Sequence, residues 1–145
     1  MWEYITKAAT AWFLGFFPFL EIYVAIPASI ALGLDYVSVV FWCVLGNYMP
    51  VPMIVAFHSR LRRVPRIGPW LDRLATGRGR RILHRHGPMF VLFATPWIGI
   101  WAVAAAAQTL GMHRGKLLFY SFASVAGYGI ILTIMIALGL DWFSD

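Results

Sequence analysis

Glu21 is the residue of this sequence best placed to do chemistry in apolar surroundings. It lies near the middle of residues 13–34, an apolar stretch that Pro18 and Pro27 interrupt. A buried carboxylate without a partner costs several kcal/mol, so it must be paired, hydrated or protonated. Desolvation favours the neutral acid, whereas a helix beginning after Pro18 favours the anion at its N-terminus. The pattern indicates a site for a proton, a cation or a substrate; the alternative is a glutamate near a membrane interface without that role.

Three neutral polar side chains, Asn47, Gln108 and Ser29, also lie in apolar surroundings. Each can line a cavity, and each can equally form a hydrogen bond between helices. For Gln108 and Ser29 the helix–helix bond is the more ordinary role. Asn47 precedes two prolines, and we place it with the candidate path.

Aromatic and basic side chains near the backbone breaks complete the candidate set. Tyr23, Trp97 and Trp101 lie close to prolines, where aromatic faces can hold an organic cation, although packing in the core or against lipid is the commoner role. Arg114 and His113 can present charge to a phosphate-bearing ligand or relay protons. Their ordinary role is to anchor a helix end at the interface.

The histidines and the lone cysteine do not form a metal-binding pattern. His58, His84 and His86 have no cysteine or acidic cluster beside them, and Cys43 lies alone in an apolar run. A structural zinc site needs four such ligands. We also find no nucleophile motif, phosphate-binding glycine loop or catalytic carboxylate pair. The sequence predicts no metal, no cofactor and no enzyme.

Composition places the chain in a membrane. Of its 145 residues, 61% are hydrophobic and 12% are charged, which excludes an ordinary soluble domain. The net charge of +6 does not indicate nucleic-acid binding, because nine of the twelve Lys and Arg residues lie between Arg60 and Arg85, separating apolar segments. That distribution is typical of a cytoplasmic membrane loop.

The apolar stretches set the order of the elements. We expect an interfacial start at residues 1–12, a first interrupted segment at 13–34 and a span at 37–57. A basic loop at 58–86, a second interrupted segment at 87–111 and a second span at 117–140 follow. Within the loop, Trp70, Leu71 and Leu74 can form a short amphipathic helix on the membrane surface, although an Arg-rich loop held by anionic lipid headgroups is the favoured interpretation. The interruption of the second segment is expected at Pro96 and Gly99. Each interrupted segment either crosses as a kinked helix or enters and returns as a re-entrant hairpin.

Charge favours the re-entrant topology. If residues 87–111 turn back, the basic residues 113–116 lie on the same side as the Arg-rich loop. Asp35, Asp141 and Asp145 then share the opposite side. This arrangement places every Lys and Arg except Lys7 inside the cell, as the positive-inside rule requires.

The two interrupted segments also resemble each other. A shift of 78 residues aligns Pro18 with Pro96 and Leu32-Gly33 with Leu110-Gly111, and it pairs Phe41 with Phe119. Because the copies begin on opposite sides of the membrane, the echo predicts inverted repeats with broken helices, a recurrent design of transporters.

Several of these motifs together resemble the small multidrug export protein family, which is related to the DedA, or SNARE-associated Golgi (VTT), membrane proteins. The motifs are Glu21-x-x-x-Ala25-Ile26-Pro27, Ala31-Leu32-Gly33, Leu45-Gly46-Asn47 ahead of Pro50-Val51-Pro52, the Arg-rich loop and Pro96-x-x-Gly99-x-Trp101. The similarity covers about residues 13–140. The family pattern has an Arg and a Gly where this chain has Tyr23 and Val24, which removes the expected charge partner of Glu21.

The resemblance implies a fold of two re-entrant hairpins with spanning helices, and either drug export or movement of a lipid-type substrate with proton dependence. We predict an all-α membrane protein of the prokaryotic inner membrane, with repeats at about 10–57 and 87–140 joined by a basic linker at 58–86. The expected partners are membrane lipids, a small-molecule or lipid substrate and a second copy in a homodimer. The predicted function is a proton-coupled secondary transporter whose path includes Glu21, Tyr23, Pro27, Asn47, Trp97, Trp101, Gln108 and Arg114. The alternative is a scaffold or assembly subunit that binds anionic lipid or a partner through its basic loop.

Overall fold

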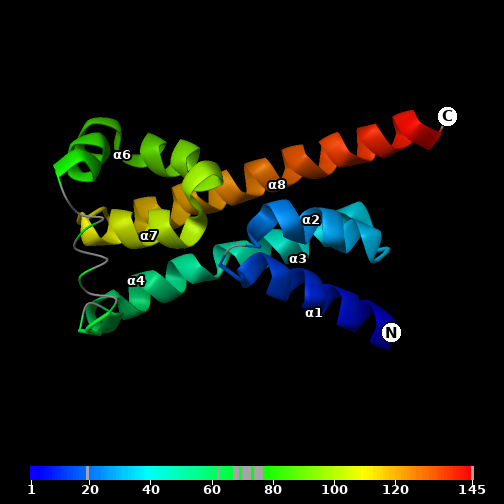
Figure 1. Ribbon diagram of the computed structural model, residues 1–145, viewed down its shortest axis with the longest axis horizontal. Helices are drawn as coiled ribbons and strands as arrows, with labels where there is room; N and C mark the ends of the chain where they lie inside the picture. The colour runs from blue at the N-terminus through cyan, green and yellow to red at the C-terminus, as the bar shows by residue number, and fades with distance from the viewer. Residues whose placement is uncertain (19, 62, 67–68, 70–72, 74–76, 145) are drawn as a thin grey trace. The chain divides into compact units, whose positions relative to one another are not determined.

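The computed structural model describes every residue except 19, 62, 67–68, 70–72, 74–76 and 145 (Figure 1). The described residues form helices joined by turns, with no strand, which confirms the predicted all-α class. The helices are α1 (Trp2–Phe16), α2 (Glu21–Ala31), α3 (Tyr36–Tyr48), α4 (Pro50–Leu61), α6 (Gly77–Ile98), α7 (Ile100–Thr109) and α8 (Arg114–Ser144). The amphipathic helix predicted at Trp70, Leu71 and Leu74 falls outside the described residues.

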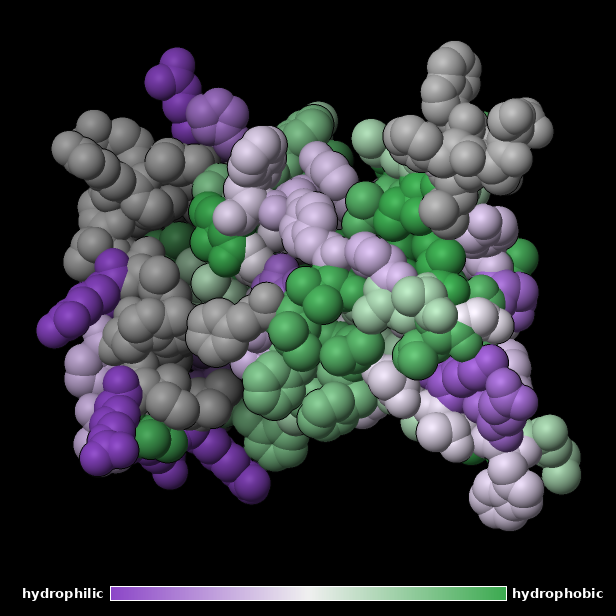
Figure 2. Space-filling view, turned by 45° about the vertical axis from the view of Figure 1, so that its right-hand side comes forward, coloured by the Kyte–Doolittle hydropathy of each residue, from purple (hydrophilic) through white to green (hydrophobic). Residues whose placement is uncertain are grey.

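Two helical stretches of the described chain are long and apolar enough to cross a bilayer, Tyr36–His58 and Arg114–Gly139. They coincide with the spans predicted at residues 37–57 and 117–140. Figure 2 shows broad hydrophobic areas on the face in view. Large apolar side chains such as Phe119 and Leu138 are exposed in the structure. Soluble monomers rarely expose contiguous apolar surface on this scale. The chain is therefore an integral membrane protein.

The helices break where the backbone cannot continue. Helix α1 ends at Phe16, and Phe17 has ψ 127°, the extended conformation favoured before a proline such as Pro18. The second predicted break falls at Gly99, whose φ of 96° ends α6 and begins α7. Gly87, the predicted start of the second segment, has non-helical angles within α6.

Two of the predicted interruptions are wrong, because α2 continues through Pro27 and α6 continues through Pro96. A proline inside a helix leaves the carbonyl four residues earlier without its amide donor. At Pro96 that carbonyl belongs to Leu92, and the Ser124 hydroxyl donates to it at 2.7 Å. The side-chain hydrogen bond replaces the lost one, which explains why α6 persists there.

The chain divides into two compact units, of which one contains α1 and α2 and the other contains α6 and α7. Unit 1 contains residues 1–48 and 125–145, and unit 2 contains residues 49–124. The units are not the two sequence repeats, because the long helix α8 contributes its first third to unit 2 and the rest to unit 1.

In unit 1, α1 and α2 form an antiparallel hairpin that packs against α3 (Figure 1). The Lys7 ammonium near the start of α1 lies 3.5 Å from where a Cβ on Gly33, just past α2, would lie. Helices α1 and α3 cross at glycines: a Cβ on Gly46 would lie 2.0 Å from the Trp12 carbonyl oxygen, and one on Gly15 would lie 2.6 Å from that of Cys43. Only residues without a side chain permit backbones to approach so closely.

In unit 2, α7 packs against both α4 and α6. His58 of α4 meets the end of α7, with Nε2 2.9 Å from the Thr109 hydroxyl oxygen. That hydroxyl donates its proton to the Ala105 carbonyl at 2.7 Å, so His58 Nε2–H must be the donor between the two side chains.

Backbone geometry recurs at the 78-residue spacing that the sequence suggested. Gly33 and Gly111 both have positive φ, and each closes a Schellman motif at the end of a short helix. In the first, Leu34 N–H donates to the Ser29 carbonyl; in the second, Met112 N–H donates to that of Ala107. The same shift relates the starts of α3 and α8, where Val39 and Leu117 donate to residues 35 and 113.

Candidate functional site

Glu21 is the first residue of α2 and is partly buried. Its φ of 44° is the one positive value that the described residues show outside glycine. Its amide donates to the Phe17 carbonyl at 3.3 Å, as Gly99 donates to Thr95 at 3.0 Å in the equivalent turn. A left-handed backbone costs a side-chain-bearing residue about 1–2 kcal/mol. The first turn thus keeps a carboxylate where the second turn uses glycine, and such local strain is concentrated at functional sites.

Three helices of unit 1 converge beside Glu21. A Cβ on Gly129 of α8 would lie 2.9 Å from Ile22 Cδ1 and 2.8 Å from Val44 Cγ2. Ile22 follows Glu21 in α2, and Val44 belongs to the last turns of α3. The first turn of α2, the end of α3 and the middle of α8 therefore meet at one point, which we call the Gly129 junction.

Asn47 reaches this region from α3. It is 2% exposed, and its side-chain oxygen Oδ1 has no hydrogen-bond partner. Its backbone nitrogen lies 3.2 Å from where a Cβ on Gly15 would be, in the last turn of α1 before the chain turns toward Glu21. Because residues three apart share a helix face, Asn47 also lies one turn beyond Val44 on the side of α3 that meets the junction.

Tyr23 lies near the carboxylate and near a second tyrosine, Tyr128. The Tyr23 phenol interacts electrostatically with both Glu21 and Tyr128. Tyr128 immediately precedes Gly129 in α8 and was not among the residues predicted from the sequence. An aromatic residue within a clean apolar span gives no signal by itself; the small residue beside it, which marks a close helix contact, is the feature that points to it.

Pro27 belongs to this region through its missing amide. A proline inside a helix has no amide to donate to the carbonyl four residues earlier. The ring itself is exposed. Pro27 thus lies six residues beyond Glu21 and leaves α2 helical.

The remaining predicted site residues belong to unit 2. Trp97 is 88% exposed at the end of α6, Trp101 is partly buried in α7, and Arg114 is exposed at the start of α8. Gln108 of α7 has a buried side-chain oxygen without a partner. The structure gathers Glu21, Tyr23 and Asn47 within unit 1, and a path that also includes the unit 2 residues stays a prediction.

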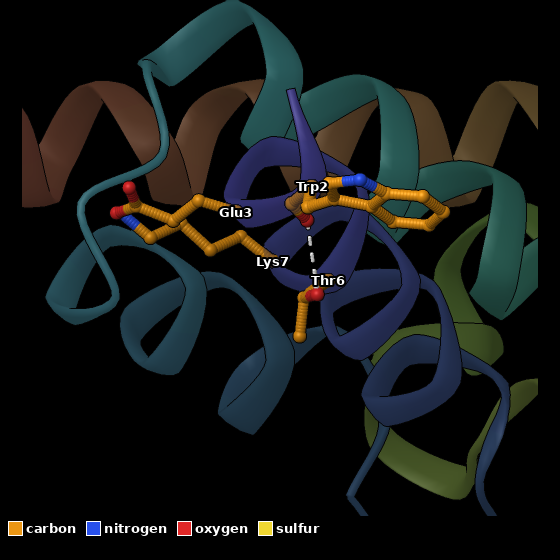
Figure 3. A network of polar contacts seen from close by, with 4 residues as sticks. All are labelled: Trp2, Glu3, Thr6 and Lys7. Carbon is orange, nitrogen blue, oxygen red and sulfur yellow. Dashed lines mark hydrogen bonds and ion pairs between the residues drawn. The ribbon is translucent and has the colours of Figure 1, made fainter.

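Two other acids of unit 1, Glu3 and Asp35, are engaged at the opposite end of the hairpin. Glu3 pairs with Lys7 at 2.7 Å, and Figure 3 shows the two side chains turned toward each other beside the Thr6–Trp2 hydrogen bond. The hydrogen bond and charge of Lys7 hold the pKa of Glu3 below its ordinary value. Asp35 accepts the Ser38 amide at 2.9 Å and caps α3; this amide and the Ser38 hydroxyl lower its pKa.

Two apolar grooves of unit 1 lie apart from the polar residues of the candidate site. One of ≈ 370 Å³ lies between α1 and α3 and includes Trp12 and Trp42, and the other of ≈ 450 Å³ lies between α3 and α8. Neither is lined by Glu21, Tyr23 or Asn47. Among the described residues no group of three or more histidine, cysteine or acidic side chains comes together as metal ligands. The chemistry that the site supports is therefore that of a partly buried carboxyl group with phenol and amide neighbours.

Comparison with known families gives a match over most of the chain. Residues 21–131 match the model of the family described as "Putative small multi-drug export protein". The match begins at Glu21 and takes in every helix from α2 to α7 and the apolar first half of α8. Comparison with curated proteins and with solved structures finds no match.

Proposed function

Because this chain belongs to the small multi-drug export protein family, we propose that it is a proton-coupled secondary transporter that exports small molecules or moves a lipid-type substrate. The observation that carries the proposal is the carboxyl group of Glu21. It occupies a left-handed position at the start of a short apolar helix, where the equivalent turn of unit 2 has glycine. An ionisable residue within a membrane segment is costly, and a chain that keeps one in strained backbone has a use for it.

We propose that Glu21 takes up and releases a proton at this position. The amides at the start of α2 stabilise the carboxylate, whereas apolar surroundings such as Ile22 favour the neutral acid. Glu21 can then take up a proton on one side of the membrane and release it on the other, so that movement of the proton is coupled to movement of the substrate. We propose that the Tyr23 phenol, which interacts electrostatically with Glu21 and with Tyr128, binds a polar group of the substrate.

The proposed topology follows from helix length. Helix α2 has 11 residues and α7 has 10, so each extends for about 15 Å, half the thickness of the hydrocarbon core. We place both hairpins as re-entrant elements of two inverted repeats, as the matching turns at Glu21 and Gly99 support. We further propose a homodimer in a prokaryotic inner membrane and kinship with the DedA proteins.

The central experiment measures pH-driven flux through the purified protein in liposomes. Glu21→Gln keeps the size and the hydrogen-bonding groups of the side chain but cannot take up or release a proton, so it should abolish pH-dependent transport. Glu3→Gln is the matched control, because that acid is exposed at the far end of the hairpin and should leave flux unchanged. Unchanged flux in Glu21→Gln would remove the residue from the mechanism.

A separate measurement addresses topology. Single cysteines at positions 20, 35, 98 and 113, placed in a Cys43→Ser background, report which face of the membrane each position reaches. Re-entrant hairpins predict labelling of positions 35 and 113 from opposite faces and protection of the two turn positions. Removal of residues 58–86 distinguishes the scaffold alternative, because a scaffold loses its activity with this basic loop while a path near Glu21 retains flux.

A further inference from the structure

Unit 1 contains a hydrogen-bond acceptor that lacks a donor. Asn47 is 2% exposed and its Oδ1 makes no hydrogen bond in the structure. Leaving such a group buried and unsatisfied is expensive, so native proteins rarely retain one unless another state of the protein supplies the missing partner. A neighbouring group that gains a proton in another state of the protein can supply this partner.

The missing donor is available at the Gly129 junction. Ile22 and Val44 approach the same point on α8, and their neighbours are Glu21 on α2 and, one turn further, Asn47 on α3. A carboxylate has no proton to donate, whereas a protonated carboxyl group donates one hydrogen bond. We propose that Asn47 Oδ1 accepts the hydrogen bond of protonated Glu21, so that this amide holds the proton during the transport cycle. The inference rests on the proposed function of Glu21.

The other titratable groups near the junction do not compete for this role. Tyr23 of α2 interacts electrostatically with Glu21 and, separately, with Tyr128 of α8. On α3, Cys43 is buried with its thiol 3.4 Å from the Ser29 hydroxyl, and Tyr48 follows Asn47. The last turns of α1, from residue 10 to residue 16, carry no ionisable side chain, and Glu3 and Lys7 of that helix are paired at its other end. Asn47 differs from these tyrosine and cysteine side chains, because its amide oxygen accepts a hydrogen bond and the amide does not titrate.

The proposal predicts opposite effects from two substitutions of similar size. Asn47→Leu removes the acceptor, so protonated Glu21 loses its hydrogen bond and the pH midpoint of Glu21-dependent flux should fall by about one pH unit, the worth of one hydrogen bond. Asn47→Asp keeps the shape and adds a negative charge, which favours the proton on Glu21 and should move the midpoint to higher pH. Ser121→Ala, which changes a buried unpartnered hydroxyl of unit 2, is the control and should leave the midpoint unchanged.

Infrared difference spectroscopy of the protein in lipid vesicles measures the same bond without transport. A carboxylic C=O band that titrates in the wild type and is missing in Glu21→Gln reports protonated Glu21. In Asn47→Leu this band should shift to the frequency of a carboxyl group without a hydrogen-bond acceptor. The isosteric Asn47→Asp variant keeps the test informative if Asn47→Leu does not fold.

Several outcomes overturn the inference. If the Glu21 band titrates and neither its frequency nor its midpoint changes in the Asn47 variants, Asn47 does not hold the proton, and the transporter proposal stands. A midpoint that rises in Asn47→Leu would mean that the amide N–H group stabilises the carboxylate instead. If no band depends on Glu21, the inference and the proton-coupled function fall together.

Discussion

Two segments of this chain share one backbone design and fill it with different chemistry. At the first turn of each short helix the left-handed residue is Glu21 in unit 1 and Gly99 in unit 2. Gly46 in α3 lets the backbones of α1 and α3 touch. The equivalent residue in α8 is Ser124, whose hydroxyl donates a hydrogen bond to the Leu92 carbonyl of α6. The helix starts also differ, since Asp35 caps α3 through its carboxylate and His113 caps α8 through Nδ1, which accepts the Gly115 amide at 3.2 Å.

The comparison separates what the backbone requires from what function adds. The Schellman turns at Gly33 and Gly111 are the same because only glycine adopts that conformation without strain. At Glu21 the chain gives up that advantage, although the equivalent turn shows that glycine serves the fold equally well. The carboxyl group is therefore the part of this turn that the fold does not explain.

The largest expected effect comes from the glycine crossing of α1 and α3. Gly46→Ala places a Cβ against the Trp12 carbonyl oxygen, and because backbone cannot yield as a side chain does, unfolding free energy should fall by about 3 kcal/mol or more. Ser124→Ala, at the equivalent position, loses one hydrogen bond and should cost about 1 kcal/mol. Thermal unfolding in detergent measures both. Gly127→Ala meets open space and should be neutral or stabilising; a loss there equal to that of Gly46→Ala would contradict the steric account.

The two left-handed turns should respond in opposite ways to exchange of their residues. Gly99 has φ 96° and ψ 145°, a region essentially restricted to glycine, so Gly99→Ala should destabilise by about 2 kcal/mol. Glu21→Gly relieves the left-handed strain but adds freedom to the unfolded chain, and these terms offset to within about 1 kcal/mol.

Flux measurements complete this comparison. Glu21→Gly should keep the fold, seen as an unchanged elution profile and melting temperature, and lose pH-dependent transport. If it transports normally, the carboxyl group has no role and the strain at Glu21 needs another explanation.

The smallest expected effect is on stability: it comes from the Asp35 cap of α3 and depends on pH. The Ser38 amide and hydroxyl keep the pKa of Asp35 below its ordinary value. A depressed pKa means that the folded state is stabilised above the pKa of the unfolded chain, and that the stabilisation disappears as pH falls through the folded value. The stability difference between wild type and Asp35→Ala should therefore be present at pH 7 and shrink on acidification. A difference between wild type and Asp35→Ala that persisted at low pH would contradict this account.

Much of the fold follows from local rules that a sequence reveals. Pro18 sets Phe17 extended and ends α1, and the apolar lengths of residues 37–57 and 117–140 anticipate the two long helical stretches. The Leu-Gly pairs at 32–33 and 110–111 anticipate the ends of α2 and α7. Local rules fail at Pro96, because whether a helix tolerates a proline depends on a distant donor, here Ser124.

In the candidate site, too, some features follow from the sequence and others depend on the tertiary structure. The sequence by itself determined that Glu21 is an acid in an apolar, interrupted segment and that Asn47 is a polar residue beside helix-loosening prolines, because residue type and neighbours are enough for both. Tertiary structure decided that Glu21 is left-handed, that Tyr128 of α8 comes near Tyr23 and that Asn47 Oδ1 is buried without a donor. These features depend on the approach of α1, α3 and α8 at glycines far apart in the chain, and no local preference of the sequence encodes which of its glycines will carry a close contact.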